Sequence, residues 1–246
     1  MAYFMDYKLV IENSHFIIVT EDAKRWLVDT GSPISFASEE CCLQFGAGEY
    51  NVVASPAMIG DVNGSGLLEA PIDVLIGMDI LREHCLMFDR SNGTVTIDGD
   101  MGLYEVRNTL PLRVTNIMGQ SYVCCDVSIN GVSVNTILDT GACISYLSSS
   151  HLNGVESVGE VHDYNPILGE INVTKHEVTV GFDGFSKVIE VGKMPSMLEL
   201  TMQMIGINFV MGLDCLDCDC FGLDLKDGKL HVLADSVHTI EEGRTL

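Results

Sequence analysis

Two aspartates occur in the same short motif, one in each half of the chain. Residues 27–38 read LVDTGSPISFAS and residues 137–148 read ILDTGACISYLS, so six of twelve positions are identical. A carboxylate at the end of an apolar strand is unfavourable unless it is hydrogen-bonded or has a function. If the two loops face each other, Asp29 and Asp139 meet, and two carboxylates in contact share one proton. Such a pair supplies an acid and a base that together can activate a water molecule.

The threonine and the glycine of each motif fit this arrangement. Gly31 and Gly141 lack a Cβ atom, which lets each loop turn sharply and brings its N–H groups close to the carboxylate. Thr30 and Thr140 can direct their hydroxyls into the opposite loop and fix the two loops together. We therefore expect these four residues to support the pair.

The residue after each motif differs and predicts an asymmetry within the pair. A hydroxyl of Ser32 that donates a hydrogen bond to Asp29 favours the charged form of this carboxyl. Ala142 offers no such donor to Asp139. We therefore expect Asp29 to be the ionised partner and Asp139 to carry the shared proton.

Two further pairs of similar segments follow in the same order. Residues 74–81 (VLIGMDIL) match residues 209–216 (FVMGLDCL), and residues 88–97 (FDRSNGTVTI) match residues 223–232 (LDLKDGKLHV). The first motif is offset by 110 residues and the other two by 135. The chain is therefore an internal duplication with about 25 extra residues in the second copy.

Short apolar runs and turn residues predict strands in both copies. Phe16–Val19 is apolar, and residues 127–129 and 132–134 alternate around Asn130-Gly131, a strong hairpin signal. We predict a mainly β protein with two similar β-barrel-like lobes related by pseudo-two-fold symmetry, residues 1–105 and residues 106–246.

Other elements are expected to be short or peripheral. Short helices are predicted at Met78–Cys85 and Leu213–Cys218. The apolar terminal segments Met5–Ile11 and Leu230–Leu233 are expected to join a sheet beneath both lobes.

The repeated motifs resemble those of the aspartic peptidases. In that family an apolar-apolar-Gly element packs against each catalytic loop, and residues 75–77 (LIG) and 210–212 (VMG) match it. The continuations GMDIL and GLDCL look most like the retropepsin branch, whereas a duplication within one chain looks like the pepsin branch. The resemblance implies the acid-protease fold, Asp29 and Asp139 as the catalytic pair, and an extended polypeptide as substrate. It implies no metal and no cofactor.

In this family a β-hairpin flap closes over the substrate, and the extra residues of the second copy indicate its place. Residues 158–180 contain turn residues between alternating apolar positions, and we interpret them as the flap. The expected substrate-binding tip comprises Tyr164, Asn165, Pro166 and Ile167. In the first copy, Met58–Gly64 is interpreted as either a reduced flap or a plain loop.

One dense group of cysteines has two interpretations. Cys215, Cys218 and Cys220 form a C-x2-C-x-C pattern, which could bind a soft metal together with Cys85 or His84. We favour buried thiols on a short helix and the following strand, and we assign no metal site.

The charge and composition exclude several partners. There are 13 Lys and Arg against 35 Asp and Glu, a net charge of -22, which argues against binding to nucleic acid. The sequence has no apolar stretch of about 18 residues for a membrane span and no recognisable signal peptide. We therefore expect a cytoplasmic protein with reduced cysteines. One chain supplies both aspartates, so we expect a monomer.

Three functions are compatible with these patterns. The first is an aspartic endopeptidase, the second a catalytically silent retropepsin-like module that binds peptides or proteins, and the third a metal-dependent protein that uses the cysteines. Both DTG triplets and both glycine elements are intact. This favours the endopeptidase, because a decayed enzyme is expected to lose one of them.

Overall fold

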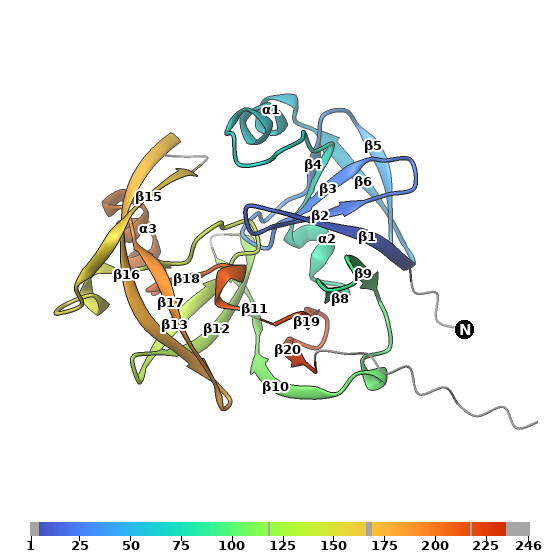
Figure 1. The fold of residues 1–246 in the computed structure, drawn as a ribbon. Helices are drawn as coiled ribbons and strands as arrows, with labels where there is room; N and C mark the ends of the chain where they lie inside the picture. Colours follow the sequence, from blue (N-terminus) through green and yellow to red (C-terminus); the bar gives the residue numbers. More distant parts are fainter. Residues whose placement is uncertain (1–4, 118, 166–168, 217, 235–246) are drawn as a thin grey trace, which may run out of the picture.

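The computed structural model describes residues 5–117, 119–165, 169–216 and 218–234 of the chain. Over these residues the protein is mainly β, with a few short helices, which confirms the predicted fold class (Figure 1). Within this described part, no helix has the length and apolar character needed to span a membrane.

The first copy forms a series of short strands with two helices. Its elements are β1 (Met5–Glu12), β2 (His15–Val19), β3 (Arg25–Val28), β4 (Phe36–Ala37), β5 (Cys41–Phe45), β6 (Gly48–Ala54), α1 (Pro56–Gly64), β7 (Val74–Ile76), α2 (Met78–Leu81), β8 (Cys85–Asp89) and β9 (Thr94–Ile97). The 3₁₀ helix η1 (Met101–Leu103) leads to the second copy.

The second copy repeats this order with longer strands. Its elements are β10 (Val106–Pro111), β11 (Arg113–Ile117), β12 (Gln120–Ile129), β13 (Val132–Leu138), β14 (Tyr146–Leu147), η2 (Ser149–His151), β15 (Ser157–Asn165), β16 (Gly169–Phe182), β17 (Phe185–Lys193), α3 (Ser196–Met204), β18 (Phe209–Met211), η3 (Leu213–Cys215), β19 (Cys220–Asp224) and β20 (Lys229–Leu233).

Tight turns connect the strands that lead to each DTG loop. Asn130 and Gly131 join β12 to β13 with φ angles of 49° and 84°, and Asn13 and Ser14 join β1 to β2 with φ angles of 45° and 65°. Two-residue turns with positive φ match the right-handed twist of the strands they join. The hairpin predicted at Asn130-Gly131 is therefore confirmed.

The two copies share one sheet. Twelve strands run in the order β10-β20-β19-β8-β9-β1-β2-β3-β7-β4-β6-β5, and at the junction β8 pairs antiparallel with β19, with Met87 opposite Gly222. The terminal strands β1 and β20 both belong to this sheet, but β9, β8 and β19 lie between them, so each pairs within its own copy. The second sheet, β11-β12-β13-β18-β14-β17-β16-β15, belongs to the second copy alone.

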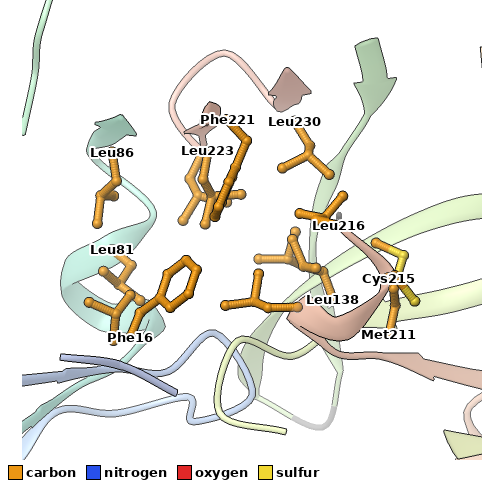
Figure 2. Packing of buried hydrophobic residues seen from close by; sticks show 14 of the residues in the cluster. Phe16, Leu81, Leu86, Leu138, Met211, Cys215, Leu216, Phe221, Leu223 and Leu230 are labelled. Atoms are coloured by element: carbon orange, nitrogen blue, oxygen red, sulfur yellow. The ribbon is translucent and has the colours of Figure 1, made fainter. Parts of the chain in front are cut away.

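An apolar core continues from one copy into the other. Figure 2 shows Phe16, Leu81 and Leu86 of the first copy in the same cluster as Leu138 and Phe221 of the second. The rings of Phe88 and Phe221 stack with centroids 4.8 Å apart. Complete burial of a side chain of this size contributes about 1.5–3 kcal/mol. The predicted division after residue 105 thus falls between η1 and β10, and the segments on either side of it share a sheet and a core.

The copies differ most between β4 and β7 of the first and between β14 and β18 of the second. The first copy has helix α1, so the interpretation of Met58–Gly64 as a reduced flap or a plain loop is wrong. Pro56 fits the first turn of this helix because its missing N–H needs no partner there, and Ile59 buries the inner face. The second copy has the helix α3 at the position of α1, and it carries the long hairpin β15–β16 before β17 and α3 (Figure 1).

The helices that follow the glycine elements are shorter than predicted. Helix α2 ends at Leu81 and η3 ends at Cys215. The next strands, β8 and β19, begin at Cys85 and Cys220 and pair with each other. Of the residues predicted as helix, Cys85 joins β8, whereas residues 82–84, 216 and 218 lie in neither a helix nor a strand.

Candidate active site

Each DTG loop begins where a buried strand ends. Strand β3 leads to Asp29 and β13 leads to Asp139. The backbone N–H of Asp29 donates to the carbonyl of Ile76 at 3.0 Å, and that of Asp139 donates to the carbonyl of Met211 at 2.9 Å. Because β7 and β18 run parallel to β3 and β13, the two apolar-apolar-Gly elements pack against the loops as expected.

The two threonines fasten the loops to each other with a symmetric set of hydrogen bonds. Thr30 Oγ1 accepts from the N–H of Thr140 at 3.0 Å and donates to the carbonyl of Leu138 at 2.8 Å. Thr140 Oγ1 accepts from the N–H of Thr30 at 3.0 Å and donates to the carbonyl of Val28 at 2.8 Å. Both threonines are fully buried. Each threonine hydroxyl therefore contacts the opposite loop, the geometry that the sequence predicted.

The two carboxyl groups lie face to face between the loops. A Cβ atom on Gly31 would stand 2.4 Å from Oδ1 of Asp139, and one on Gly141 would stand 2.6 Å from Oδ1 of Asp29. Only glycine leaves room for this approach. The structure thus brings together Asp29 and Asp139, which are separated by 110 residues in the sequence.

Burial raises the pKa of both aspartates above the ordinary range. For Asp29 the negative charge of Asp139 is the next cause, while the N–H groups of Gly31 and Ser32 oppose the shift. These N–H groups reach Oδ1 of Asp29 at 2.8 and 3.1 Å, and the N–H of Gly141 reaches Oδ1 of Asp139 at 2.9 Å. Each aspartate keeps partial access to solvent despite its dense surroundings. A pair in this environment holds one proton near neutral pH.

The surroundings of the two carboxyls favour Asp29 as the carrier of the shared proton, whereas the sequence predicted Asp139. Burial raises the pKa of both carboxyls, and the negative charge of Asp139 raises the pKa of Asp29 further. At Asp139 the N–H of Gly141, then the hydrogen bond with Asp29 and then His15 oppose the rise in pKa. The predicted contact from the Ser32 hydroxyl to Asp29 is absent, because Ser32 Oγ donates to the carbonyl of Ile34 at 2.8 Å. Only the backbone N–H of Ser32 contacts Asp29.

A second symmetric pair supports the loops, and the sequence analysis missed it. Ser35 Oγ accepts from the N–H of Gly77 at 2.9 Å and donates to Asp79 at 2.6 Å. In the second copy Ser145 Oγ accepts from the N–H of Gly212 at 2.9 Å and donates to Asp214 at 2.6 Å. The sequence did contain a signal for it: a serine recurs six residues after the aspartate of each DTG motif, and an aspartate recurs two residues after the glycine of each apolar-apolar-Gly element.

The β1–β2 turn of the first copy reaches the second DTG loop. His15 is buried at the start of β2, and both its ring nitrogens lie 3.6 Å from Sγ of Cys143. Cys143 follows Asp139 by four residues. This contact explains how a histidine from the first copy affects Asp139, and no sequence pattern pointed to it.

An open cavity of about 660 Å³ adjoins the second DTG loop. Its walls come from both copies and include Asn13, Ser14, residues 65–67, Cys143, Ile144 and Val161–Tyr164. The β15–β16 hairpin predicted as a flap thus forms one wall, with Tyr164 among its lining residues. Of the other predicted tip residues, Asn165 ends β15, whereas Pro166 and Ile167 lie outside the described residues.

The cysteine group does not form a cluster in the described part of the chain. Cys215 packs in the large core, whereas Cys220 packs with Cys85 in a separate apolar cluster. His84 binds Asp98 at 2.8 Å and Tyr50 at 2.7 Å instead of facing these thiols. Among the described residues, no three His, Cys, Asp or Glu side chains are grouped as metal ligands would be.

Comparison with solved structures reveals similarity at low sequence identity. An aspartic proteinase from Irpex lacteus aligns over 96% of this chain and 99% of its own, with 13% identity and a TM-score of 0.51. Basic 7S globulin from soybean aligns over 96% of each chain, with 11% identity and a TM-score of 0.49. EIAV protease, solved in complex with the inhibitor HBY-793, covers 42% of this chain and 91% of its own, with 22% identity and a TM-score of 0.30.

The sequence itself carries no comparable match. No protein-family model and no curated protein matches it. At identities this low, structural similarity shows the fold and does not show an activity. Over almost its whole length, this chain has the pepsin-like fold of the aspartic proteinases.

Proposed function

We propose that the protein is an aspartic endopeptidase that hydrolyses peptide bonds of an extended polypeptide. The observation that carries this proposal is the pair of carboxyls of Asp29 and Asp139, held face to face by the reciprocal bonds of Thr30 and Thr140. Such a pair provides an acid and a base at one point. The chemistry requires a water molecule and these two side chains.

The two aspartates take different roles in the proposed reaction. Ionised Asp139 removes a proton from the water, whose oxygen forms a bond to the scissile carbonyl carbon. Protonated Asp29 transfers its proton to the carbonyl oxygen and stabilises the gem-diol. In the second step Asp139 delivers its proton to the amide nitrogen, the C–N bond breaks, and Asp29 recovers a proton from the diol.

The surroundings of the pair support a polypeptide as substrate. The open cavity beside the second catalytic loop is bounded by both copies and by the β15–β16 hairpin. A single chain supplies both carboxyls, so we propose that the monomer is active. The cavity is lined in part by Asn13 and Ser14, whose polar groups can form hydrogen bonds to the main chain of an extended peptide.

A peptide-library digest between pH 3 and pH 8 tests the proposal. Wild type is expected to cleave internal peptide bonds, and Asp29→Asn and Asp139→Asn are expected to abolish cleavage. Asp126→Asn is the matched control, because Asp126 is half-exposed and pairs with Arg113 on the surface. Cleavage that survives either catalytic substitution would remove the mechanism.

A binding measurement separates the endopeptidase from a silent peptide-binding module. A peptide with a statine group, which mimics the gem-diol, should bind wild type and inhibit cleavage. Binding of ordinary peptides by wild type, without cleavage at any pH, would instead favour the module.

A further inference from the structure

One carboxyl of the β15–β16 hairpin, the flap hairpin, lies in an otherwise apolar row. Val161 and Asp163 stand on β15 opposite Val173 and Ile171 on β16. The three apolar members pack in one cluster beneath the hairpin. Asp163 is only 7% exposed. A carboxylate buried among apolar groups is costly unless it is hydrogen-bonded.

The partner of Asp163 comes from the strand that leaves the second catalytic loop. The hydroxyl of Tyr146 on β14 donates to Oδ2 of Asp163, and the N–H of Tyr164 donates to Oδ1 at 2.8 Å. Tyr146 is itself only 6% exposed. Burial, and then the bond to Asp163, raises the pKa of Tyr146, so the phenol keeps its proton and remains the donor.

The neighbouring strand makes room for the Tyr146 ring. Gly192 on β17 lies beside Tyr146 in the sheet. A Cβ atom at Gly192 would stand 2.7 Å from Val173 and 3.1 Å from the Tyr146 ring. The ring therefore occupies a fitted position between the sheet and the hairpin.

The first copy provides an internal comparison. Phe36 follows Asp29 by seven residues, as Tyr146 follows Asp139, and it lies on β4, the counterpart of β14. Phe36 has no hydroxyl, and the first copy has only the short hairpin β5–β6 before helix α1, where the second copy has β15–β17 before α3. The phenol hydroxyl is thus present in the copy that has an acceptor above it.

We propose that Tyr146 and Asp163 form a latch, a directional hydrogen bond that fixes the flap hairpin at one height above the second catalytic loop. Apolar contacts alone are non-directional and tolerate sliding, whereas a buried bond fixes position. Asp163 and Ile144 of the catalytic loop both line the open cavity, so this height sets the width of the cavity. The consequence for catalysis rests on the proposed function, and both latch residues are positioning residues.

Hydrogen exchange of the full chain tests the latch without requiring activity. In Tyr146→Phe, amides of β15 and β16 are expected to exchange about tenfold faster, the effect of one lost buried hydrogen bond. Tyr122→Phe is the matched control, because its hydroxyl bonds to Gln120 at 2.8 Å and not to the hairpin. Unchanged exchange in Tyr146→Phe would overturn the latch.

Two substitutions of Asp163 distinguish the effect of its hydrogen bond with Tyr146 from the effect of apolar packing. Asp163→Val completes the apolar row and removes the acceptor, so fast exchange is expected even if the fold gains stability. Asp163→Asn keeps an acceptor oxygen for Tyr146, so exchange should stay slower than in Asp163→Val. If Asp163→Val exchanges as slowly as wild type, packing alone holds the hairpin and the latch is wrong.

Peptide hydrolysis supplies a separate readout. In Tyr146→Phe, KM should rise severalfold while kcat changes less, because the variant alters the flap and leaves the catalytic pair intact. If wild type cleaves no peptide but exchange responds as described, the proposed function fails and the latch stands. If wild type cleaves and exchange does not respond, the latch fails alone.

Discussion

Replacing Asp29 by asparagine should stabilise the fold at neutral pH while it removes activity. Burial and the charge of Asp139 raise the pKa of Asp29 to about 8. In the unfolded chain an aspartate has a pKa of about 3.9. Between these values the folded protein holds a proton that the unfolded chain has released, so the stability of wild type falls as pH rises through this window.

The size of the effect follows from proton linkage. One proton bound only by the folded state changes the free energy of unfolding by about 1.4 kcal/mol per pH unit. From pH 4 to pH 7 this gives at most about 4 kcal/mol, and partial access of the pair to solvent reduces it to about 2–4 kcal/mol. Asparagine carries no charge and can donate to Asp139. The free energy of unfolding of Asp29→Asn should therefore fall much less than that of wild type between pH 4 and pH 7.

Urea unfolding of wild type and Asp29→Asn at pH 4, 5.5, 7 and 8 measures the difference. The two proteins should have similar stability at pH 4, and the variant should be about 2–4 kcal/mol more stable at pH 7. Asp126→Asn is the control for the same chemical change at a surface ion pair, where an effect of about 0–1 kcal/mol is expected.

Parallel pH dependence would refute this reasoning. If wild type and Asp29→Asn lose stability equally between pH 4 and pH 8, the two carboxyls do not share a proton in the folded protein. The proposed division of roles between Asp29 and Asp139 would then have no basis.

Three further predictions concern the loops around the pair. Thr30→Ala leaves the N–H of Thr140 and the carbonyl of Leu138 without the threonine hydroxyl as partner. The free energy of unfolding, measured in urea titrations, should therefore fall by about 2–4 kcal/mol. Thr30→Ser keeps the hydroxyl and should keep most of this stability. Gly31→Ala should abolish peptide cleavage because its Cβ would stand 2.4 Å from Asp139. Gly60→Ala is the control, because no atom lies within 4 Å of the added Cβ. It should leave cleavage unchanged and stabilise helix α1 by about 0.5–1 kcal/mol. Ser32→Ala should leave the acidic limb of the kcat/KM profile in place, since the hydroxyl bonds to Ile34; a shifted limb would restore the role predicted from sequence.

The pair of aspartates could be identified from sequence because its determinants are local and repeated. Each aspartate ends an apolar strand and is followed by threonine and glycine, and the copies occur at a fixed order with the glycine elements. A duplicated loop implies a two-fold relation, and this relation brings Asp29 and Asp139 together. The β15–β16 hairpin was likewise predictable, because alternating apolar residues flank a turn within the extra segment.

Other features depended on contacts between distant residues. The hydroxyl of Ser32 had two acceptors within reach, and the folded loop selects the carbonyl of Ile34. Residues 58–64 lacked a clear periodicity, and the helix there is fixed by Pro56 and by burial of Ile59. His15 contacts Cys143 across 128 residues, a distance at which no sequence pattern operates.

The sequence by itself determined that two DTG loops exist, that they belong to a duplicated β chain, and which carboxyls form the pair. Local strand, turn and glycine preferences act over a few residues, so they can be recognised in the sequence alone. The tertiary structure alone decided which groups surround each carboxyl, where each hydroxyl points, and that Asp163 lies buried against Tyr146. These outcomes depend on burial and on the direction of hydrogen bonds, which arise only when segments far apart in the chain are packed together.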